Sequence, residues 1–228
     1  MILAIESATP RGSVALVSGG AVLAEAALPP GRQASEAYIS AVEGLFAASG
    51  TAPGVVSCVA VSAGPGAFTG LRVGMSAAKG FCFGWGVPLA SVSTLHALAH
   101  RFPGEGRTVC PVQDARKREV YAALFRWEGG ELARLSPDMA LAPGLLPGRI
   151  PDGDVLFCGD AVARFGALFR ESLGDRATLL AGDEGLPRAS SVGILGERIF
   201  RDGGAADPRA AVPFYLRTSG AWLLRPRP

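Results

Sequence analysis

The chain has 228 residues, of which 49% are hydrophobic and 18% are charged, and its formal net charge at pH 7 is +2. This length is sufficient for one large domain or for two compact lobes. So small a net charge does not by itself indicate a nucleic-acid or membrane partner. The chain has no apolar run of about eighteen uncharged residues, and we expect no membrane-spanning helix.

The amino terminus and the cysteines indicate a cytoplasmic protein. The first five residues are apolar, lack a basic flank and are followed by Glu6, which is unlike a signal peptide. The four cysteines lie far apart in apolar surroundings and form no C-x-x-C pair, so we expect buried free thiols rather than disulfides or metal ligands: Cys58, Cys82, Cys110 and Cys158.

The first half of the chain predicts an antiparallel meander followed by helices that alternate with strands. Alternation and turn residues place its three strands at 2–6, 13–17 and 22–28. A helix is then expected at 35–48, a buried strand at 55–62, a helix that begins at Thr69 as its N-cap and ends near Gly84, a strand at 88–92 and a helix at 93–101.

The helices at 35–48 and 69–84 have more apolar and small surface than one core face needs. The second has only Arg72 and Lys79 as charges, and it contains glycines, each of which costs about 1 kcal/mol relative to alanine in a helix. Two interpretations stay open, a core helix under a sheet and a helix that also forms a subunit interface. The candidate interface residues are Tyr38, Ile39, Val42, Leu45, Phe46, Gly70, Val73, Gly74, Ala77, Ala78 and Phe81.

The turn between the first two strands gathers one carboxylate and three hydroxyls: Glu6, Ser7, Thr9 and Ser13. Such a turn could hold a nucleotide phosphate through its hydroxyl and N–H donors, with the carboxylate near magnesium. The alternative is an ordinary hairpin turn whose hydroxyls cap their own backbone. The glycine loop at 64–70 is not a P-loop, because Leu71 and Arg72 stand where Lys and Ser or Thr are required.

The breaker-rich loop at 103–106 predicts a boundary between two lobes, residues 1–104 and 105–228. The second lobe repeats the pattern of the first, which suggests a duplicated architecture. Its expected strands are 108–113, 119–127, 131–135, 155–158 and 177–181, and its expected helices 160–171 and 191–200; residues 137–151 have no assignment, 212–217 should be extended and 225–228 disordered.

Two further groups of polar residues allow a functional and a structural interpretation. Three consecutive cations, Arg116, Lys117 and Arg118, could contact RNA phosphate or simply form a solvated turn. His96 and His100 have the spacing of a helical metal pair, but no acidic residue lies between them and no third ligand is apparent. A structural role for these histidines is therefore expected.

Five segments in this order resemble the bacterial TsaB (YeaZ) family: Ile2-Leu-Ala-Ile-Glu-Ser-Ala-Thr, Gly64-Pro-Gly-Ala-Phe-Thr-Gly-Leu-Arg-Val-Gly, Val92-Ser-Thr-Leu, Asp114-Ala-Arg-Lys-Arg-Glu-Val-Tyr and Pro213-Phe-Tyr-Leu-Arg. The resemblance spans essentially the whole chain. It departs from the family pattern at Glu6, where Asp is usual, and at Ala34, where His is usual.

The resemblance implies an α/β fold of the actin-like ATPase type, shared with sugar kinases and chaperone ATPases, in which each lobe is a mixed sheet flanked by helices and opening with an antiparallel meander. It implies a non-catalytic subunit that supports a TsaD-like subunit in threonylcarbamoylation of the adenosine beside the tRNA anticodon. The implied partners are TsaD, a TsaE-like ATPase, tRNA through the complex, and a second copy of the chain in isolation. The implied contact surface is the helix pair at 35–48 and 69–84.

Three alternatives accompany this expectation. ATP or ADP with magnesium could bind at or near the subunit interface. The chain could instead be a stand-alone nucleotide hydrolase or kinase, or a metallopeptidase-like protein.

Aligned on the strand at 89–92, the metal-binding histidines of TsaD fall at Thr94 and Leu98, about 200° around the helix from His96 and His100. The histidine spacing is therefore expected to be coincidental.

Overall fold

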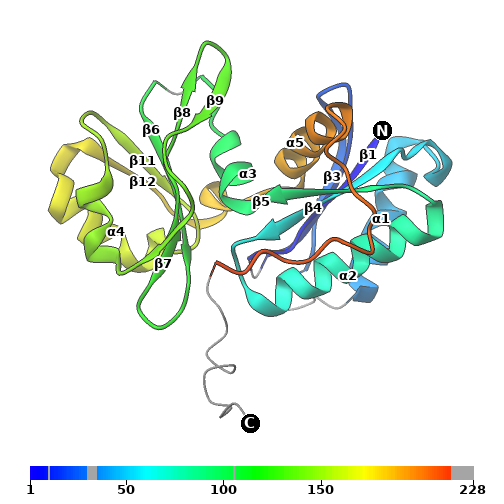
Figure 1. The fold of residues 1–228 in the computed structure, drawn as a ribbon, viewed down its shortest axis with the longest axis horizontal. Helices are drawn as coiled ribbons and strands as arrows, with labels where there is room; N and C mark the ends of the chain where they lie inside the picture. The colour runs from blue at the N-terminus through cyan, green and yellow to red at the C-terminus, as the bar shows by residue number, and fades with distance from the viewer. Residues whose placement is uncertain (10, 30–34, 105, 217–228) are drawn as a thin grey trace, which may run out of the picture.

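The computed structural model describes residues 1–9, 11–29, 35–104 and 106–216. Two lobes lie side by side, each built on one β-sheet, with helix α3 (Thr94–His100) between them (Figure 1). The predicted disordered tail at 225–228 lies outside the described residues. Within the part that is described, no helix has the length and hydropathy needed to cross a membrane.

The first lobe contains a five-stranded sheet in the order β3-β2-β1-β4-β5. Its central strands are buried along their whole length, which explains their continuous apolar sequence. Strands β1, β2 and β3 form the predicted meander, while β4 and β5 add in parallel. The strands are β1 (Ile2–Glu6), β2 (Ser13–Ser18), β3 (Ala21–Ala27), β4 (Cys58–Gly64) and β5 (Leu89–Ser93).

Helices cover both faces of this sheet. Alternate residues of β1 divide between them: Leu3 and Ile5 face α1 and α2, while Ile2 and Ala4 face α5. These helices are α1 (Ser35–Ser49), α2 (Phe68–Trp85) and α5 (Ala189–Arg201). The last of them comes from the far end of the chain, as Figure 1 shows.

The second lobe repeats the strand order of the first. Its sheet runs β10-β7-β6-β11-β12, with two antiparallel pairs followed by two parallel pairs. These strands are β6 (Thr108–Asp114), β7 (Val120–Ala122), β10 (Met139–Leu141), β11 (Val155–Cys158) and β12 (Ala177–Leu180), and α4 (Val162–Leu173) packs on one face. The duplication predicted from the sequence is therefore present in the topology.

Several sequence predictions for this lobe require correction. The strand expected at 119–127 is two strands, because β7 pairs with β10 while β8 (Phe125–Glu128) turns away to pair with β9 (Glu131–Arg134). The third strand of the meander is β10, in the unassigned 137–151 stretch, and not 131–135. That stretch also contains two 3₁₀ turns, Pro143–Leu145 and Pro147–Arg149.

The division into residues 1–104 and 105–228 is also incorrect for the end of the chain. Helix α5 packs on β1, β2, β4 and β5. Farther along, the Ala206 N–H donates to the Leu89 carbonyl at 2.9 Å, and the Phe214 N–H to the Ala63 carbonyl at 2.6 Å. The chain thus crosses to the second lobe and returns to the first. The four cysteines are buried and free, as predicted.

Candidate functional site

Helix α2 is held against the sheet by a stripe of small and apolar residues at four-residue spacing. Gly70, Gly74, Ala78 and Cys82 are buried along this stripe. A β-carbon at Gly74 would collide with the Ser7 side chain, so only glycine allows α2 this close to the turn after β1. Ala67, not the predicted Thr69, is the N-cap residue of α2, and no side chain caps the helix there.

Aromatic rings join α2 to α1. The Trp85 ring lies 4.9 Å from the Phe81 ring and 5.9 Å from the Phe46 ring, measured between centroids. Phe46 is buried, while Phe81 and Trp85 are half-buried. The two helices therefore form one continuous surface on this side of the first lobe.

The outward side of this helix pair is made of small residues. Ser40, Gly44 and Ala48 are exposed on α1, and Ser76, Gly80 and Gly84 are exposed on α2, in both cases four residues apart. A β-carbon added at Gly44, Gly80 or Gly84 would meet no atom within 4 Å. Two large apolar side chains flank these stripes, Ile39 with 48% exposure and Phe83 with 59%. We call this surface the α1–α2 face.

The structure divides the predicted interface residues into two groups. Ile39 is exposed, and Val73, Ala77 and Phe81 are half-buried. The other predicted residues are buried within the first lobe, where they hold the helices on the sheet: Tyr38, Val42, Leu45, Phe46, Gly70, Gly74 and Ala78. Phe83 and the exposed glycines replace them on the surface.

The polar side chains of the turn after β1 are buried, and among the described residues Glu6 Oε2 and Ser7 Oγ have no hydrogen-bond partner. Glu6, Ser7, Thr9 and Ser13 are all buried, and the Glu6 carboxylate accepts a hydrogen bond from the Ala8 N–H at 2.6 Å. Burial raises the pKa of Glu6 to about 7, against the opposing effect of hydrogen bonds from Ser62 and from the backbone of Ala8 and Thr9. The Ser13 hydroxyl oxygen accepts from the Ala189 N–H at 2.9 Å.

All four side chains are thus buried in the turn itself, which is the arrangement described by the structural alternative, a turn whose polar groups serve its own backbone. Among the described residues, no group of three or more His, Cys, Asp or Glu is placed to hold a metal ion.

A cleft of about 470 Å³ opens between the lobes beside this turn. Its walls come from the start of α2, from the end of β6 and the turn that follows it, and from the turn after β11; they include Thr69, Gln113, Asp114, Arg116 and Asp160. Gln113 is 2% exposed, and neither polar atom of its amide has a hydrogen-bond partner among the described residues. The sequence did not single out Gln113, because only the fold brings it opposite α2.

The cleft contains two carboxylates that neighbouring groups engage. Asp160 Oδ1 accepts from the Asp114 N–H at 2.9 Å, and burial raises the pKa of Asp160. Asp114 pairs with Arg164 at 3.3 Å and with Arg116 at 3.9 Å.

The predicted cation cluster forms the turn between β6 and β7, and Arg116, its first residue, lines the cleft. Arg116, Lys117 and Arg118 are exposed, and all three have left-handed backbone, with φ of 62°, 49° and 61°. Left-handed backbone is uncommon for residues other than glycine. The turn thus presents three consecutive cations to solvent.

The two histidines pack on the inserted β8–β9 hairpin. The His96 ring stacks on Phe125 with centroids 5.4 Å apart, and His100 lies 5.4 Å from the Trp127 ring. Burial lowers the pKa of His96 to about 4, with Arg134 adding to the effect, so this imidazole is neutral at pH 7. These contacts place the histidines in the packing between the lobes.

The carboxyl-terminal segment contributes a further exposed cluster at the start of α2. The Tyr215 ring lies 5.2 Å from the Phe68 ring, and Arg72 Nε donates to the Tyr215 hydroxyl at 3.0 Å. Phe68, Phe214 and Tyr215 are each more than one-third exposed. This apolar cluster continues the α1–α2 face toward the cleft.

Comparison with known proteins identifies the family. The family model for TsaD, described as tRNA N6-adenosine threonylcarbamoyltransferase, matches residues 21–224. The Bacillus subtilis protein named tRNA threonylcarbamoyladenosine biosynthesis protein TsaB is 30% identical over 222 residues, which cover 96% of this chain and 95% of that protein. The chain belongs to the TsaB (YeaZ) family. The TsaD family model also matches most of this chain.

Other members of the TsaB family agree in sequence and in structure. The Escherichia coli protein of the same name is 31% identical over 236 residues, covering 99% of this chain and 98% of that protein. The solved structure of YeaZ from Pseudomonas aeruginosa superposes with a TM-score of 0.80 at 28% identity and covers 94% of this chain and 99% of that one. The predicted two-lobed α/β fold is thus confirmed.

Proposed function

We propose that this chain serves in the biosynthesis of tRNA threonylcarbamoyladenosine, as the non-catalytic subunit that binds a TsaD-like catalytic subunit through the α1–α2 face. Support for the pathway comes from the names of its TsaB relatives, which match it over nearly their full length. Support for a TsaD-like partner comes from the family model that both kinds of protein share. The cytoplasm is the expected location for a protein that acts on tRNA.

The observation that carries the choice of surface is the pair of exposed glycines inside the helices, Gly44 and Gly80. Each sits where alanine would fit freely, so the packing of the isolated chain does not require glycine. Each costs its helix about 1 kcal/mol relative to alanine. A second backbone that approaches closely provides a reason for this composition, since small residues let two helices come near each other.

The flanking side chains fit the same interpretation. Ile39 and Phe83 are large, apolar and about half exposed, and a central apolar anchor is typical of the residues that dominate binding energy. A partner that covers both helices would bury these two side chains together with the glycine stripes. The stripes set the distance of approach, and the anchors supply most of the apolar area.

Catalysis is assigned to the partner. The Glu6 carboxylate and the hydroxyls beside it are buried, and the Ala8 N–H donates to one Glu6 oxygen, which favours a structural role for them. We propose that a TsaE-like ATPase and tRNA join through the complex, and that the α1–α2 face forms a homodimer when the partner is absent. A stand-alone nucleotide hydrolase would bind ATP tightly by itself, which calorimetry on the purified chain tests directly.

Co-elution tests the surface. We expect Phe83→Arg to remove this chain from the peak of its host's TsaD-like subunit in gel filtration, because a charge would replace an apolar anchor. The matched control is Leu145→Arg, which changes an equally apolar residue, 64% exposed, on the second lobe. Loss of co-elution in both variants, or in neither, would contradict the assignment of the α1–α2 face.

A further inference from the structure

The β8–β9 hairpin interrupts the duplicated pattern of the second lobe and reaches the first lobe instead. Its strands pair with each other from Phe125 and Arg134 at the base to Glu128 and Glu131 at the tip. In Figure 1 the hairpin lies at the top of the boundary between the lobes, whereas β7 and the start of α2, which border the cleft, lie at the bottom. A contact made by the hairpin therefore acts at the opposite end of this boundary from the cleft.

Two ring contacts attach strand β8 to helix α3. The His96 ring stacks on the Phe125 ring with centroids 5.4 Å apart and an interplanar angle of 15°, and the His100 ring lies 5.4 Å from the Trp127 ring. The two histidines are four residues apart, so one side of α3 makes both contacts. Contacts between aromatic rings stabilise packing by more than the apolar area that they bury.

Strand β9 attaches the hairpin to two further elements of the first lobe. Arg134 Nη2 donates to the Ser93 hydroxyl at the end of β5 at 3.4 Å, and the Arg134 guanidinium lies 4.6 Å from the centroid of the Phe125 ring. Glu131 Oε2 accepts from Arg198 Nη1 of α5 at 2.9 Å. Glu131 is 76% exposed, and exposed ion pairs contribute little, so the ring contacts provide most of the attachment.

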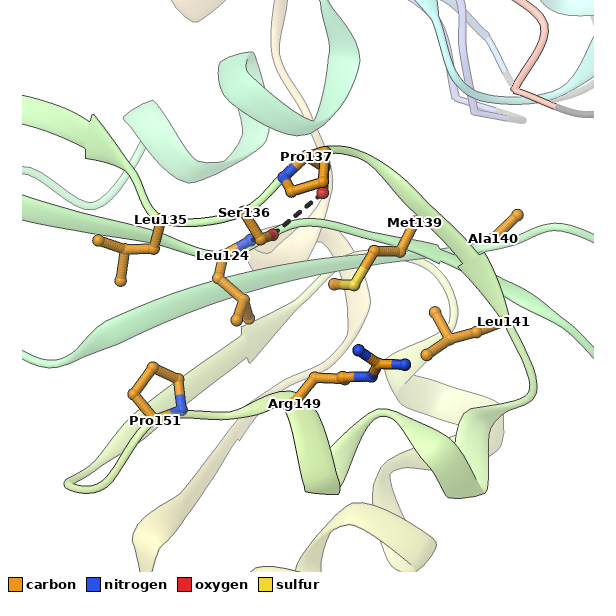
Figure 2. A pocket seen from close by; sticks show the side chains of 9 residues that line it. All are labelled: Leu124, Leu135, Ser136, Pro137, Met139, Ala140, Leu141, Arg149 and Pro151. Carbon is orange, nitrogen blue, oxygen red and sulfur yellow. Dashed lines mark hydrogen bonds between the residues drawn. The ribbon is translucent and has the colours of Figure 1, made fainter.

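The base of the hairpin is fixed to its own lobe. The Leu124 N–H donates to the Ser136 hydroxyl at 2.9 Å, and the Leu135 N–H donates to the Leu124 carbonyl at 2.8 Å. The Ser136 hydroxyl donates in turn to the Pro137 carbonyl at 3.0 Å, beside the apolar pocket that Figure 2 shows on this lobe. A hairpin held at its base by one lobe and along its strands by the other couples the positions of the two lobes.

Helix α3 divides its buried contacts between the lobes. Ala97 lies in the same buried apolar cluster as Val192 of α5. Leu95 and Leu98 lie instead in a cluster with Phe125 of β8. One helix thus belongs to both cores, and the boundary has no layer along which the lobes slide freely.

The segment in which the chain returns to the first lobe is held as well. Arg101 Nη1, directly after α3, donates to the Glu184 carbonyl at 2.6 Å and to the Leu186 carbonyl. Asp183 in the same segment forms an ion pair with Arg11 of the first lobe. A hinge motion requires a few connecting residues to change their backbone angles, and these contacts oppose such a change.

We propose that the β8–β9 hairpin is a brace that holds the two lobes at one angle, so that the cleft between them keeps one width in the free chain. Rotation of the lobes would pull the His100 and Trp127 rings apart or press them together, and close-packed side chains resist both movements. The brace goes beyond the proposed function, because it concerns the isolated chain and requires no partner.

Distance measurements between two spin labels test the brace. The labels are attached to Thr69→Cys, which lines the cleft from α2, and to Lys117→Cys, which follows Arg116 on the opposite wall. Both positions are exposed, whereas the four native cysteines are buried. The labelled protein is diluted with unlabelled protein, so that only distances within one chain contribute. We expect a single narrow distance distribution for the otherwise unmodified chain.

Removal of one ring should release the brace. Trp127→Ala should broaden the distance distribution or add a second peak, because it deletes the contact with His100. Trp85→Ala is the matched control: Trp85 is also half-buried, but its ring packs on Phe46 and Phe81 within the first lobe. The distribution of this control should equal that of the unmodified chain.

Arg134→Ala is the second variant, and it decides the test if Trp127→Ala does not fold. It removes the bond to Ser93 and the contact with the Phe125 ring at a side chain that is 35% exposed, and it should broaden the distribution as well. Circular dichroism shows whether each variant is folded. The brace would be overturned by a broad distribution in the unmodified chain, by a narrow unshifted distribution in the folded variants, or by equal broadening in Trp85→Ala.

Discussion

The exposed helical glycines lead to a prediction in which stability and affinity change in opposite directions. Gly44→Ala and Gly80→Ala place methyl groups in open space on α1 and α2. Each should stabilise the isolated chain by about 1 kcal/mol through helix propensity. For a protein of this size, 1 kcal/mol corresponds to about 2–4 °C in melting temperature.

The same methyl groups should weaken partner binding. Additional methyl groups in a closely packed contact cost about 1–3 kcal/mol, which corresponds to roughly a 5- to 150-fold lower affinity. Thermal melts of the isolated chain give the first quantity, and calorimetric titration with the TsaD-like subunit gives the second. Ser172→Ala, at an exposed position of α4 on the second lobe, is the control that should leave the affinity unchanged.

The reasoning would be refuted by a double variant, Gly44→Ala with Gly80→Ala, that melts higher yet binds its partner within about twofold of the unmodified affinity. In that case no second backbone approaches the stripes. The glycines would then have no explanation in the interface.

Three further predictions concern the first lobe. Gly74→Ala should destabilise the chain by about 1–2 kcal/mol, opposite in sign to the exposed glycines, because its methyl group meets Ser7; chemical denaturation measures this, and a more stable variant would contradict the close packing. Leu45→Arg should yield little folded protein, because Leu45 is 2% exposed, whereas Ile39→Arg should fold normally and lose only partner binding. Circular dichroism measures the folding of each variant, and gel filtration measures its binding to the partner. Glu6 has a raised pKa in the folded state, so its stabilising effect is complete below about pH 4.5 and is lost as the pH rises through about 7. The free energy of unfolding should fall by about 3 kcal/mol over this range. Glu6→Gln should remove this pH dependence, and a free energy of unfolding of the unmodified chain that stays unchanged between about pH 5 and pH 8 would contradict the prediction.

Local sequence patterns predicted the first lobe well, since each feature there depends on neighbouring residues. The strands at 2–6 and 13–17 are marked by short runs of apolar residues, as expected for buried strands. The turn between them is marked by residues that interrupt regular structure. The errors were at boundaries. Thr69 has the chemistry of an N-cap, but the cap of α2 lies two residues earlier, at Ala67, where tertiary packing decides the start.

The second lobe was harder to predict because an insertion interrupts the repeat. Hydrophobic residues continue from Val120 to Trp127, and nothing in their order shows that the backbone leaves one sheet partner for another at Leu124. The Leu124 N–H donates to the Ser136 hydroxyl at 2.9 Å, a contact between distant positions that fixes this change of direction. Pairing between distant strands is not encoded in local periodicity.

The candidate sites show the same limit. The composition of α1 and α2 indicated an excess of apolar and small surface, but not which residues face outward, so buried Val42 was grouped with exposed Ile39. The interlobe cleft escaped prediction entirely, because Gln113 and Gly70 meet only after two lobes have folded and packed. The return of α5 to the first sheet was equally invisible.

The most direct test of the account is reconstitution of the modification on tRNA. The host's TsaD-like subunit, tRNA and the remaining pathway components are mixed with and without this chain, and threonylcarbamoyladenosine is measured by mass spectrometry of digested tRNA. The account predicts modification only when both proteins are present, none from this chain without the TsaD-like subunit, and loss of modification with Phe83→Arg. Modification that proceeds equally well without the chain, or that the chain performs alone, would contradict it.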